Sequence, residues 1–236
     1  MAAGIAATKT PAHRHARAGV FVFGCYSGQV AVDLLVCTAT EMECELLRPH
    51  LPVLCTGVGA VNAAFALTRY LEREGARSVV VCGIGGAYPG SGLPVAGVAW
   101  AESECYGDLG AASPEGFLDM RALGFPVIGG EQPLYNVLPM QIRPGAGSVP
   151  FVTVNTCTGD HASALALVSR TGGFVENMEG AAIAHVARLY GIPAGEVRGI
   201  SNPAGNRDRG AWRVREAAAA AQESVLEAWR AGLLSP

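Results

Sequence analysis

Short apolar runs alternate with longer segments of helical character along most of the chain. The runs at 33–37 (DLLVC) and 78–82 (SVVVC) consist mostly of apolar residues, which is typical of strands buried on both faces. We predict strands at 33–37, 51–55, 78–82, 97–102, 151–155 and 196–200, and helices at 41–48, 63–73, 180–190 and 211–230. This alternation predicts an α/β fold of three layers, α/β/α, with a central mostly parallel or mixed twisted sheet. Ligands of such folds bind at the carboxyl ends of the strands.

The predicted elements follow one another between residues 33 and 232 without an internal repeat or a low-complexity block. We therefore expect 33–236 to form a single domain, because a chain of 236 residues fits one large α/β domain. The segment 1–32 begins with basic residues and histidines among alanines, without the apolar core of a signal peptide. We interpret it as a leader that is disordered or that results from a misassigned start.

Charge is scarce and evenly spread. Half of the residues are hydrophobic and 16% are charged, which predicts extensive burial and self-association. The 17 basic and 20 acidic residues give a net charge of −3 without blocks of one sign, so no surface for nucleic acid or an anionic membrane is indicated. The uncharged stretch 78–101 is long enough to cross a bilayer, but its glycines and prolines predict strand, loop and strand. We expect a small-molecule ligand, with neither nucleic acid nor a membrane as partner.

The cysteines and lysines exclude several kinds of site. The seven cysteines are odd in number and form no C-x-x-C pair, so neither a disulfide framework nor a structural zinc site is encoded, and we expect a cytoplasmic protein. Lys9 is the single lysine of the chain and falls in the leader. A Schiff-base or phosphate-loop lysine in the body of the chain is therefore excluded.

The segments after the predicted strands carry the candidate chemistry. Glu41 and Glu45 would share one face of a helix while Glu43 points elsewhere; these carboxylates either complement the helix dipole or face the ligand crevice. Gly83, Gly85 and Gly86 follow the third strand, where they form either a tight turn or a close backbone approach to an anion or a water. Their spacing does not match G-x-G-x-x-G.

Two later segments are richer in polar groups. Glu179 opens a helix of small and apolar residues, and its carboxylate could accept both protons of a vicinal diol. Met178 beside it offers a polarizable face for a flat ring. We expect His185 to be a core or interface histidine rather than a ligand. The segment 201–209 (SNPAGNRDR) holds more polar residues than a turn requires.

Taken together, these motifs resemble the nucleoside phosphorylase and nucleosidase superfamily, in the branch of methylthioadenosine/S-adenosylhomocysteine nucleosidase. The resemblance covers about residues 33–232 and rests on A-T-E-M-E, G-V-G, G-I-G-G-A, M-E-G-A-A and R-G-I-S-N in that order. Within the superfamily, A-Y-P-G-S-G, E-N-M-E-G-A-A and S-N-P-A-G-N-R-D-R-x-x-W look like the futalosine hydrolases of the alternative menaquinone route.

The resemblance implies roles for particular residues. Glu43 would activate the attacking water, and Glu179 would bind the ribose 2′- and 3′-hydroxyls. Met178 would pack on the base or sugar, with Asn177 beside it in the substrate site. The backbone of Gly83, Ile84, Gly85 and Gly86 would lie where phosphorylases hold phosphate and nucleosidases hold water. No metal or organic cofactor is implied.

Asn202 departs from the adenine-specific nucleosidases, which the resemblance gives an aspartate at this position. The Asn amide can donate to the oxygen of a 6-oxopurine while its own oxygen accepts the proton gained at N7, which suits hypoxanthine as leaving group. A water or Asp208 would then deliver that proton. The implied activity is hydrolysis of the N-glycosidic bond of futalosine to hypoxanthine and dehypoxanthine futalosine.

Other assignments stay open at this point. Arg207 and Arg209 either meet the benzoate of futalosine or pair with Asp208 or a neighbouring subunit. For base stacking we can name only Tyr106 and Phe151 as candidates.

Alternative functions are an adenine nucleosidase acting on methylthioadenosine, S-adenosylhomocysteine or aminodeoxyfutalosine, a purine nucleoside phosphorylase, and a non-catalytic nucleoside-binding protein. The third-strand segment carries no basic residue, which favours water over phosphate as nucleophile. The resemblance further implies a homodimer or a higher homo-oligomer.

Overall fold

The computed structural model describes residues 31–145, 147–205 and 207–234. The leader predicted at 1–32 therefore lies almost entirely outside the described residues. The strands are β1 Leu35–Thr38, β2 Val53–Cys55, β3 Val79–Ala87, β4 Val98–Tyr106, β5 Gly110–Ser113, β6 Gly116–Asp119, β7 Val137–Pro139, β8 Val149–Thr153, β9 Val175–Asn177 and β10 Ala194–Pro203. The helices are α1 Ala60–Arg73, α2 His161–Thr171, α3 Gly180–Tyr190 and α4 Val214–Arg230, with short 3-10 helices η1 Glu41–Glu43 and η2 Arg209–Ala211.

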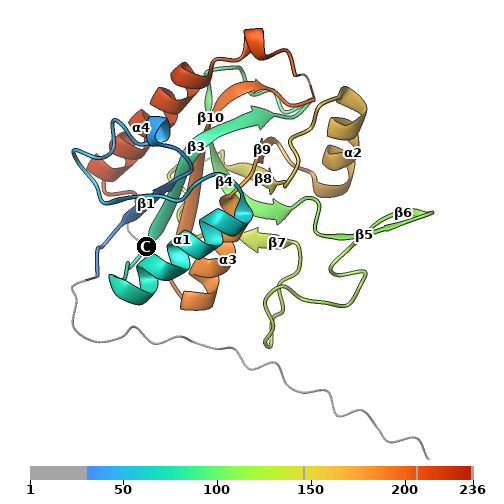
Figure 1. The fold of residues 1–236 in the computed structure, drawn as a ribbon, viewed down its shortest axis with the longest axis horizontal. Helices are drawn as coiled ribbons and strands as arrows, with labels where there is room; N and C mark the ends of the chain where they lie inside the picture. The colour runs from blue at the N-terminus through green and yellow to red at the C-terminus, as the bar shows by residue number, and fades with distance from the viewer. Residues whose placement is uncertain (1–30, 146, 206, 235–236) are drawn as a thin grey trace, which may run out of the picture.

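The central sheet is mixed and partly closed (Figure 1). Strand β10 runs parallel to β3 and antiparallel to β4, while β4, β8, β9 and β3 pair in turn, so these five strands form a ring. Strands β1 and β2 extend the sheet in parallel from β3. The prediction of a three-layer fold with a mostly parallel or mixed sheet is thus confirmed.

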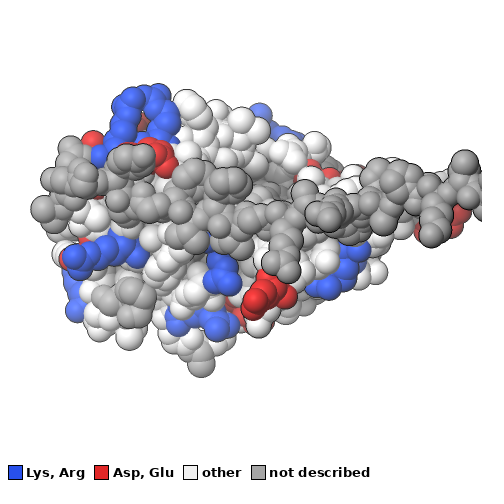
Figure 2. All heavy atoms as spheres, turned by 90° about the horizontal axis from the view of Figure 1, so that it is seen from below, with Lys and Arg blue, Asp and Glu red and all other residues white. Residues whose placement is uncertain are grey.

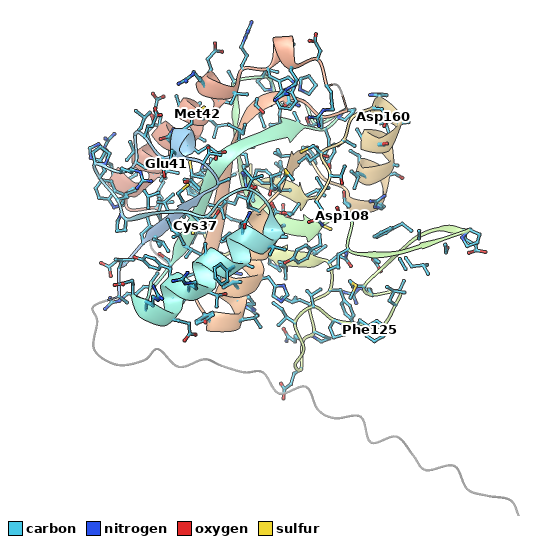
Figure 3. The ribbon with its side chains drawn as sticks, viewed as in Figure 1. Cys37, Glu41, Met42, Asp108, Phe125 and Asp160 are labelled. Carbon is cyan, nitrogen blue, oxygen red and sulfur yellow. The ribbon has the colours of Figure 1, made fainter. Side chains whose placement is uncertain are left out.

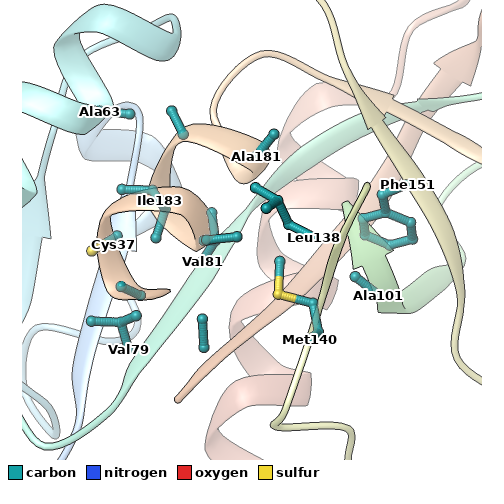
Figure 4. Packing of buried hydrophobic residues seen from close by; sticks show 14 of the residues in the cluster. Cys37, Ala63, Val79, Val81, Ala101, Leu138, Met140, Phe151, Ala181 and Ile183 are labelled. Atoms are coloured by element: carbon teal, nitrogen blue, oxygen red, sulfur yellow. The ribbon is translucent and has the colours of Figure 1, made fainter. Parts of the chain in front are cut away.

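Side chains that alternate along β1 and β3 define the two outer layers. Leu35 and Val79 pack in the cluster that includes α1 and α3, whereas Val36 and Val80 pack against α4. Both sets are buried, which explains why these strands are apolar at consecutive positions rather than at every second one. Figure 4 shows the first cluster, in which Ile183 of α3 lies near Cys37 and Val81.

One edge of β3 is unpaired over a short stretch between its two neighbouring strands. The edge facing away from β10 pairs with β1 as far as Val81, and with β9 only from Gly86 onward. Between these positions Ile84 has neither strand as a partner, and both its N–H and C=O are taken by side chains instead. The gap lies where the sheet splits between β1 and β9.

The structure corrects several predicted boundaries. The helix predicted at 41–48 is only the 3-10 helix η1 followed by turns, and the glycine segment 83–87 continues strand β3 instead of leaving it. Helix α2 and the strands β5, β6, β7 and β9 were not predicted. Strands such as β5 (GAAS) and β9 (VEN) are too short or too poor in β-branched residues to give a pattern.

Basic and acidic side chains are interspersed where the described residues are visible in Figure 2. None of the helices in the described ranges is long and apolar enough to cross a membrane. Side chains on the projecting loops are exposed, among them Phe125 at 65% relative exposure (Figure 3).

Candidate active site

A cavity of about 220 Å³ lies at the carboxyl ends of β1, β3 and β10 and at the start of α3. Most of the residues predicted from the sequence line it: Glu43, Ile84, Gly85, Gly86, Asn177, Met178, Glu179, Asn202 and Arg207. A larger hollow of about 550 Å³, lined by 87–93 and 203–205 among others, has no carboxylate or guanidinium in its lining. The smaller cavity is the candidate site because buried charged groups converge on it.

Glu43 is 3% exposed and points into this cavity. Its Oε1 accepts from the backbone N–H of Ile84 at 3.0 Å, in the gap at the edge of β3. Its Oε2 accepts from the backbone N–H and the hydroxyl of Thr40 at 2.9 and 2.8 Å. Glu41 instead forms an exposed ion pair with Arg48. Three donors thus fix the orientation of Glu43, which is buried while Glu41 is exposed, although the segment is a 3-10 helix and not the predicted α-helix.

Arg198 is the charged residue that the sequence analysis missed. It is 2% exposed, and its Nη2 lies 3.3 Å from Glu179 Oε2, its Nε 2.7 Å from Glu196 Oε1. Its Nη1 donates to the carbonyl of Ile84 at 3.2 Å. Burial alone would lower the pKa of Arg198, but the charges of Glu196, Glu179 and Glu43 raise it above its ordinary value. The available signal was an arginine two residues after Glu196 in a predicted strand whose other residues are apolar or glycine.

Glu179 is held from two sides. Besides Arg198, the backbone N–H of Gly59 donates to its Oε1 at 3.0 Å. The side chain of Asn177 accepts from the backbone N–H groups of Glu179 and Gly180 at 3.0 and 2.8 Å, so it satisfies two backbone donors at the start of helix α3. Asn177 lines the cavity, as expected, but both of its polar side-chain atoms are already engaged by protein groups.

The glycines of β3 make room for charged side chains. A Cβ on Gly83 would lie 2.6 Å from Arg198 Nη1 and 2.7 Å from Glu43 Oε1. A Cβ on Gly86 would approach Asn202 Nδ2 to 3.4 Å. Glycine is therefore needed at position 83 because Glu43 and Arg198 both approach its Cα, and not because the backbone turns there.

Asn202 also lines the cavity and is 8% exposed. A register shift in β10 between Ile200 and Asn202 interrupts the ladder just before it. The hydroxyl of Ser201 donates to Asn202 Oδ1 at 2.7 Å, and Asn202 Nδ2 donates to the carbonyl of Pro203 at 2.9 Å. The amide nitrogen carries a second hydrogen that can donate to a ligand.

The segment after β10 forms the exposed rim. Arg207 lines the cavity with its guanidinium 6.0 Å from the ring centre of Trp212, whereas Arg209 is exposed and does not line it. The indole Nε1 of Trp212 is buried without a hydrogen-bond partner in the described part of the chain. Trp212 is the aromatic lining residue, while Phe151 lies in the core and Tyr106 bonds to His185 at 3.1 Å.

Glu176 is a second residue the sequence analysis did not single out. It lines the cavity at 6% exposure. Its Oε2 accepts from the hydroxyls of Tyr88 and Thr158, and its Oε1 from the backbone N–H of Thr158 at 2.9 Å. Burial, followed by the charge of Glu176, raises the pKa of Tyr88. This carboxylate is therefore occupied in anchoring the segment around Thr158.

Comparisons with known proteins agree on a family. A family model described as "Phosphorylase superfamily" matches residues 2–231. The chain is 37% identical over 179 residues to futalosine hydrolase of Thermus thermophilus, covering 72% of this chain and 77% of that protein. It is 37% identical over 232 residues to futalosine hydrolase of Streptomyces coelicolor, covering 84% and 98%.

Solved structures show the same fold. The futalosine hydrolase of Helicobacter pylori aligns with a TM-score of 0.71 at 14% identity, over 85% of this chain and 98% of that chain. The 5'-methylthioadenosine/S-adenosylhomocysteine nucleosidase of Neisseria meningitidis, in complex with methylthio-immucillin-A, aligns with a TM-score of 0.70 at 20% identity, over 84% and 99%.

Proposed function

The chain belongs to the phosphorylase superfamily and, within it, to the futalosine hydrolases, and on that premise we propose that it hydrolyses the N-glycosidic bond of futalosine. The products are hypoxanthine and dehypoxanthine futalosine. The observation that carries the assignment of roles is that one cavity is lined by Glu43 and Glu179, both close to Arg198, and by Asn202. These are the groups that water, ribose and a 6-oxopurine need.

Glu43 is the general base of this proposal. It takes a proton from a water molecule that attacks the anomeric carbon. The bond between this carbon and the purine breaks, and its electron pair moves to the purine. The sugar passes through an oxocarbenium-like state, in which nearby carboxylates stabilise the developing positive charge. Because three donors already fix the carboxylate, little reorganisation is required at the moment of attack.

Glu179 accepts the ribose hydroxyls. Each of its oxygens has one protein donor, Gly59 N–H or Arg198, and each retains a lone pair for a hydroxyl proton. Met178 lines the same cavity and offers an apolar surface to the sugar or base.

Asn202 selects the base. Its amide nitrogen donates to the purine oxygen, and its oxygen, already accepting from Ser201, accepts from the protonated N7. An adenine nucleoside would place its amino group against the amide nitrogen and leave buried groups unpaired. Release of hypoxanthine is therefore favoured over release of adenine. The proton at N7 comes from a water or from Asp208.

Phosphate is a poor nucleophile for this cavity. Arg198 is the buried cation of the site, but its charge is matched by Glu43, Glu179 and Glu196. A phosphate dianion placed there would meet net negative charge, and a neutral water would not. This supports hydrolysis over phosphorolysis.

We place the enzyme in the cytoplasm as a homo-oligomer, acting in menaquinone formation. The six cysteines in the described part of the chain are free thiols, as expected in a reducing compartment. Helix α1 exposes Val61 at 81% and Phe65 at 61% of their surface, which an interface between copies would cover. Light scattering coupled to size exclusion tests the assembly, and a monomer would contradict it.

A direct assay tests the reaction. Purified protein is incubated with futalosine, inosine or methylthioadenosine, with and without phosphate, and free purine is measured by chromatography. We expect hypoxanthine from futalosine at a rate that phosphate does not change. A phosphate requirement with a sugar phosphate product, or faster release of adenine from methylthioadenosine, would refute the proposal.

A further inference from the structure

Two further carboxyl groups lie behind the site. Glu104 of β4 and Glu196 of β10 are both 0% exposed, and neither lines the cavity. The hydroxyl of Thr153 donates to Glu104 Oε2 at 2.8 Å, and the amide of Asn177 donates to Glu104 Oε1. Glu196 Oε1 accepts from Arg198 Nε at 2.7 Å. Each carboxyl thus contacts a residue that in turn contacts Glu179.

The two carboxyl groups face each other across Gly180. A Cβ on Gly180 would approach both Glu196 Oε2 and Glu104 Oε1 to well under 3.0 Å, so only glycine fits at this position. Glu196 Oε2 is buried and has no donor among the described residues. A buried carboxylate oxygen without a donor is costly, and two facing carboxylates without a proton would also repel.

The surroundings indicate which carboxyl is ionised. Glu196 lies against Arg198, whereas the donors to Glu104 among the described residues are the neutral groups of Thr153 and Asn177. Burial and then the charge of Glu196 raise the pKa of Glu104 well above its ordinary value. Burial also raises the pKa of Glu196, against the opposing effect of Arg198. Among the described residues, the other titratable groups that interact with the pair are Glu179, Tyr88, Cys105 and Tyr106.

We propose that Glu104 and Glu196 share one proton and are positioning residues for Glu179. Ionised Glu196 orients Arg198, whose Nη2 contacts Glu179 Oε2. Neutral Glu104 orients Asn177, whose Oδ1 receives the backbone N–H of Glu179. The binding of ribose by Glu179 rests on the proposed function, whereas the proton shared by Glu104 and Glu196 is independent of it.

Infrared spectroscopy tests the proton without any substrate. At pH 8 the full-length parent should show the carbonyl stretch of a protonated carboxylic acid, shifted in deuterium oxide. Glu104→Gln should lose this band, and Glu102→Gln, which changes an exposed carboxyl two residues away on β4, should keep it. A parent without the band, or the same band in Glu104→Gln, overturns the proposal. The parent spectrum shows whether a protonated carboxyl group is present even if a variant fails to fold.

Kinetics with futalosine test the positioning role. Glu104→Gln replaces a neutral group by a neutral one, and Asn177 Nδ2 has a second acceptor in the carbonyl of Val152 at 3.5 Å. We expect kcat/KM within about fivefold of the parent, the equivalent of one ordinary hydrogen bond. Glu196→Gln removes the charge that orients Arg198, and kcat/KM should fall about 10²-fold.

The asymmetry between these two isosteric variants separates positioning from packing, because a purely structural pair would respond equally to both substitutions. Equal losses therefore overturn the proposal. Glu196→Asp, which keeps the charge, should recover part of the loss, and no recovery would also count against it. A parent that releases no purine from futalosine while showing the infrared band refutes the proposed function and leaves the shared proton standing.

Discussion

The two ends of the cavity are built differently. At the inner end, Glu43, Arg198 and Glu179 are 2 to 5% exposed, each is hydrogen-bonded to a backbone group, and Arg198 pairs with Glu179. At the outer end, Arg207 is exposed, and the indole nitrogen of Trp212 is buried without a hydrogen-bond partner in the described residues. The inner end is therefore pre-organised before a ligand binds, whereas at the outer end Arg207 and the indole N–H of Trp212 can donate hydrogen bonds to a ligand.

This difference separates the groups that act on the reacting bond from the groups that recognise the rest of the substrate. Groups that act on the reacting bond need fixed orientation in a region of low dielectric constant, which the split between β1 and β9 provides. Groups that meet the distal part of a substrate can sit on an exposed segment, since they contribute binding rather than bond cleavage. Substitutions at the inner end should affect kcat or stability, and those at the outer end KM.

The largest effect is expected for Glu43→Gln. Loss of the general base should lower kcat on futalosine by about 10³-fold, within the usual range for such groups. The measurement is the initial rate of hypoxanthine release, with the fold checked by circular dichroism. Glu45→Gln, an exposed neighbour, is the matched control and should retain full activity. A Glu43→Gln rate within tenfold of the parent would contradict the role of general base.

Arg198→Met should produce the largest loss of stability. Removing the guanidinium leaves Glu196 and Glu179 buried and uncompensated, which costs about 3–5 kcal/mol of unfolding free energy. Urea denaturation measures the change. The exposed Arg207→Met should change stability by less than about 0.5 kcal/mol. Similar losses in the two variants would remove the distinction between the ends.

Asn202→Asp should change the preference for the base. The carboxylate would face the purine oxygen of hypoxanthine without a donor, so the ratio of kcat/KM for futalosine over methylthioadenosine should fall by about 10²-fold. Asn202→Ala serves as control, because it removes the contact without favouring adenine. An unchanged ratio in the Asp variant would show that base selection lies elsewhere.

Arg207→Gln is expected to have the smallest effect. If Arg207 meets the substrate carboxylate, KM for futalosine should rise about tenfold with kcat nearly constant, as for one exposed charge-assisted hydrogen bond. Arg209→Gln is the matched control, since Arg209 is exposed and does not line the cavity. A larger KM change in the Arg209 variant would reverse this assignment.

Much of the fold was predictable from local patterns. Helix α3 has the predicted limits of 180–190, and the buried strands β1, β3 and β10 overlap the strands predicted at 33–37, 78–82 and 196–200. The glycine segment after Cys82 was interpreted as a loop, because glycine is a poor strand former by itself. Its continuation as β3 depends on pairing with β10, which is more than 110 residues away in the chain.

The sequence by itself determined the alternating architecture and half of the residues that line the cavity, because apolar runs, a helix start at Glu179 and turn residues are local signals. Only the tertiary structure decided which charges meet. The pairing of Arg198 with Glu179, and the facing of Glu104 and Glu196 across Gly180, join β4, β10 and the start of α3 through contacts that no local pattern specifies. The physical reason is that a buried charge is stable only with partners brought to it by the fold.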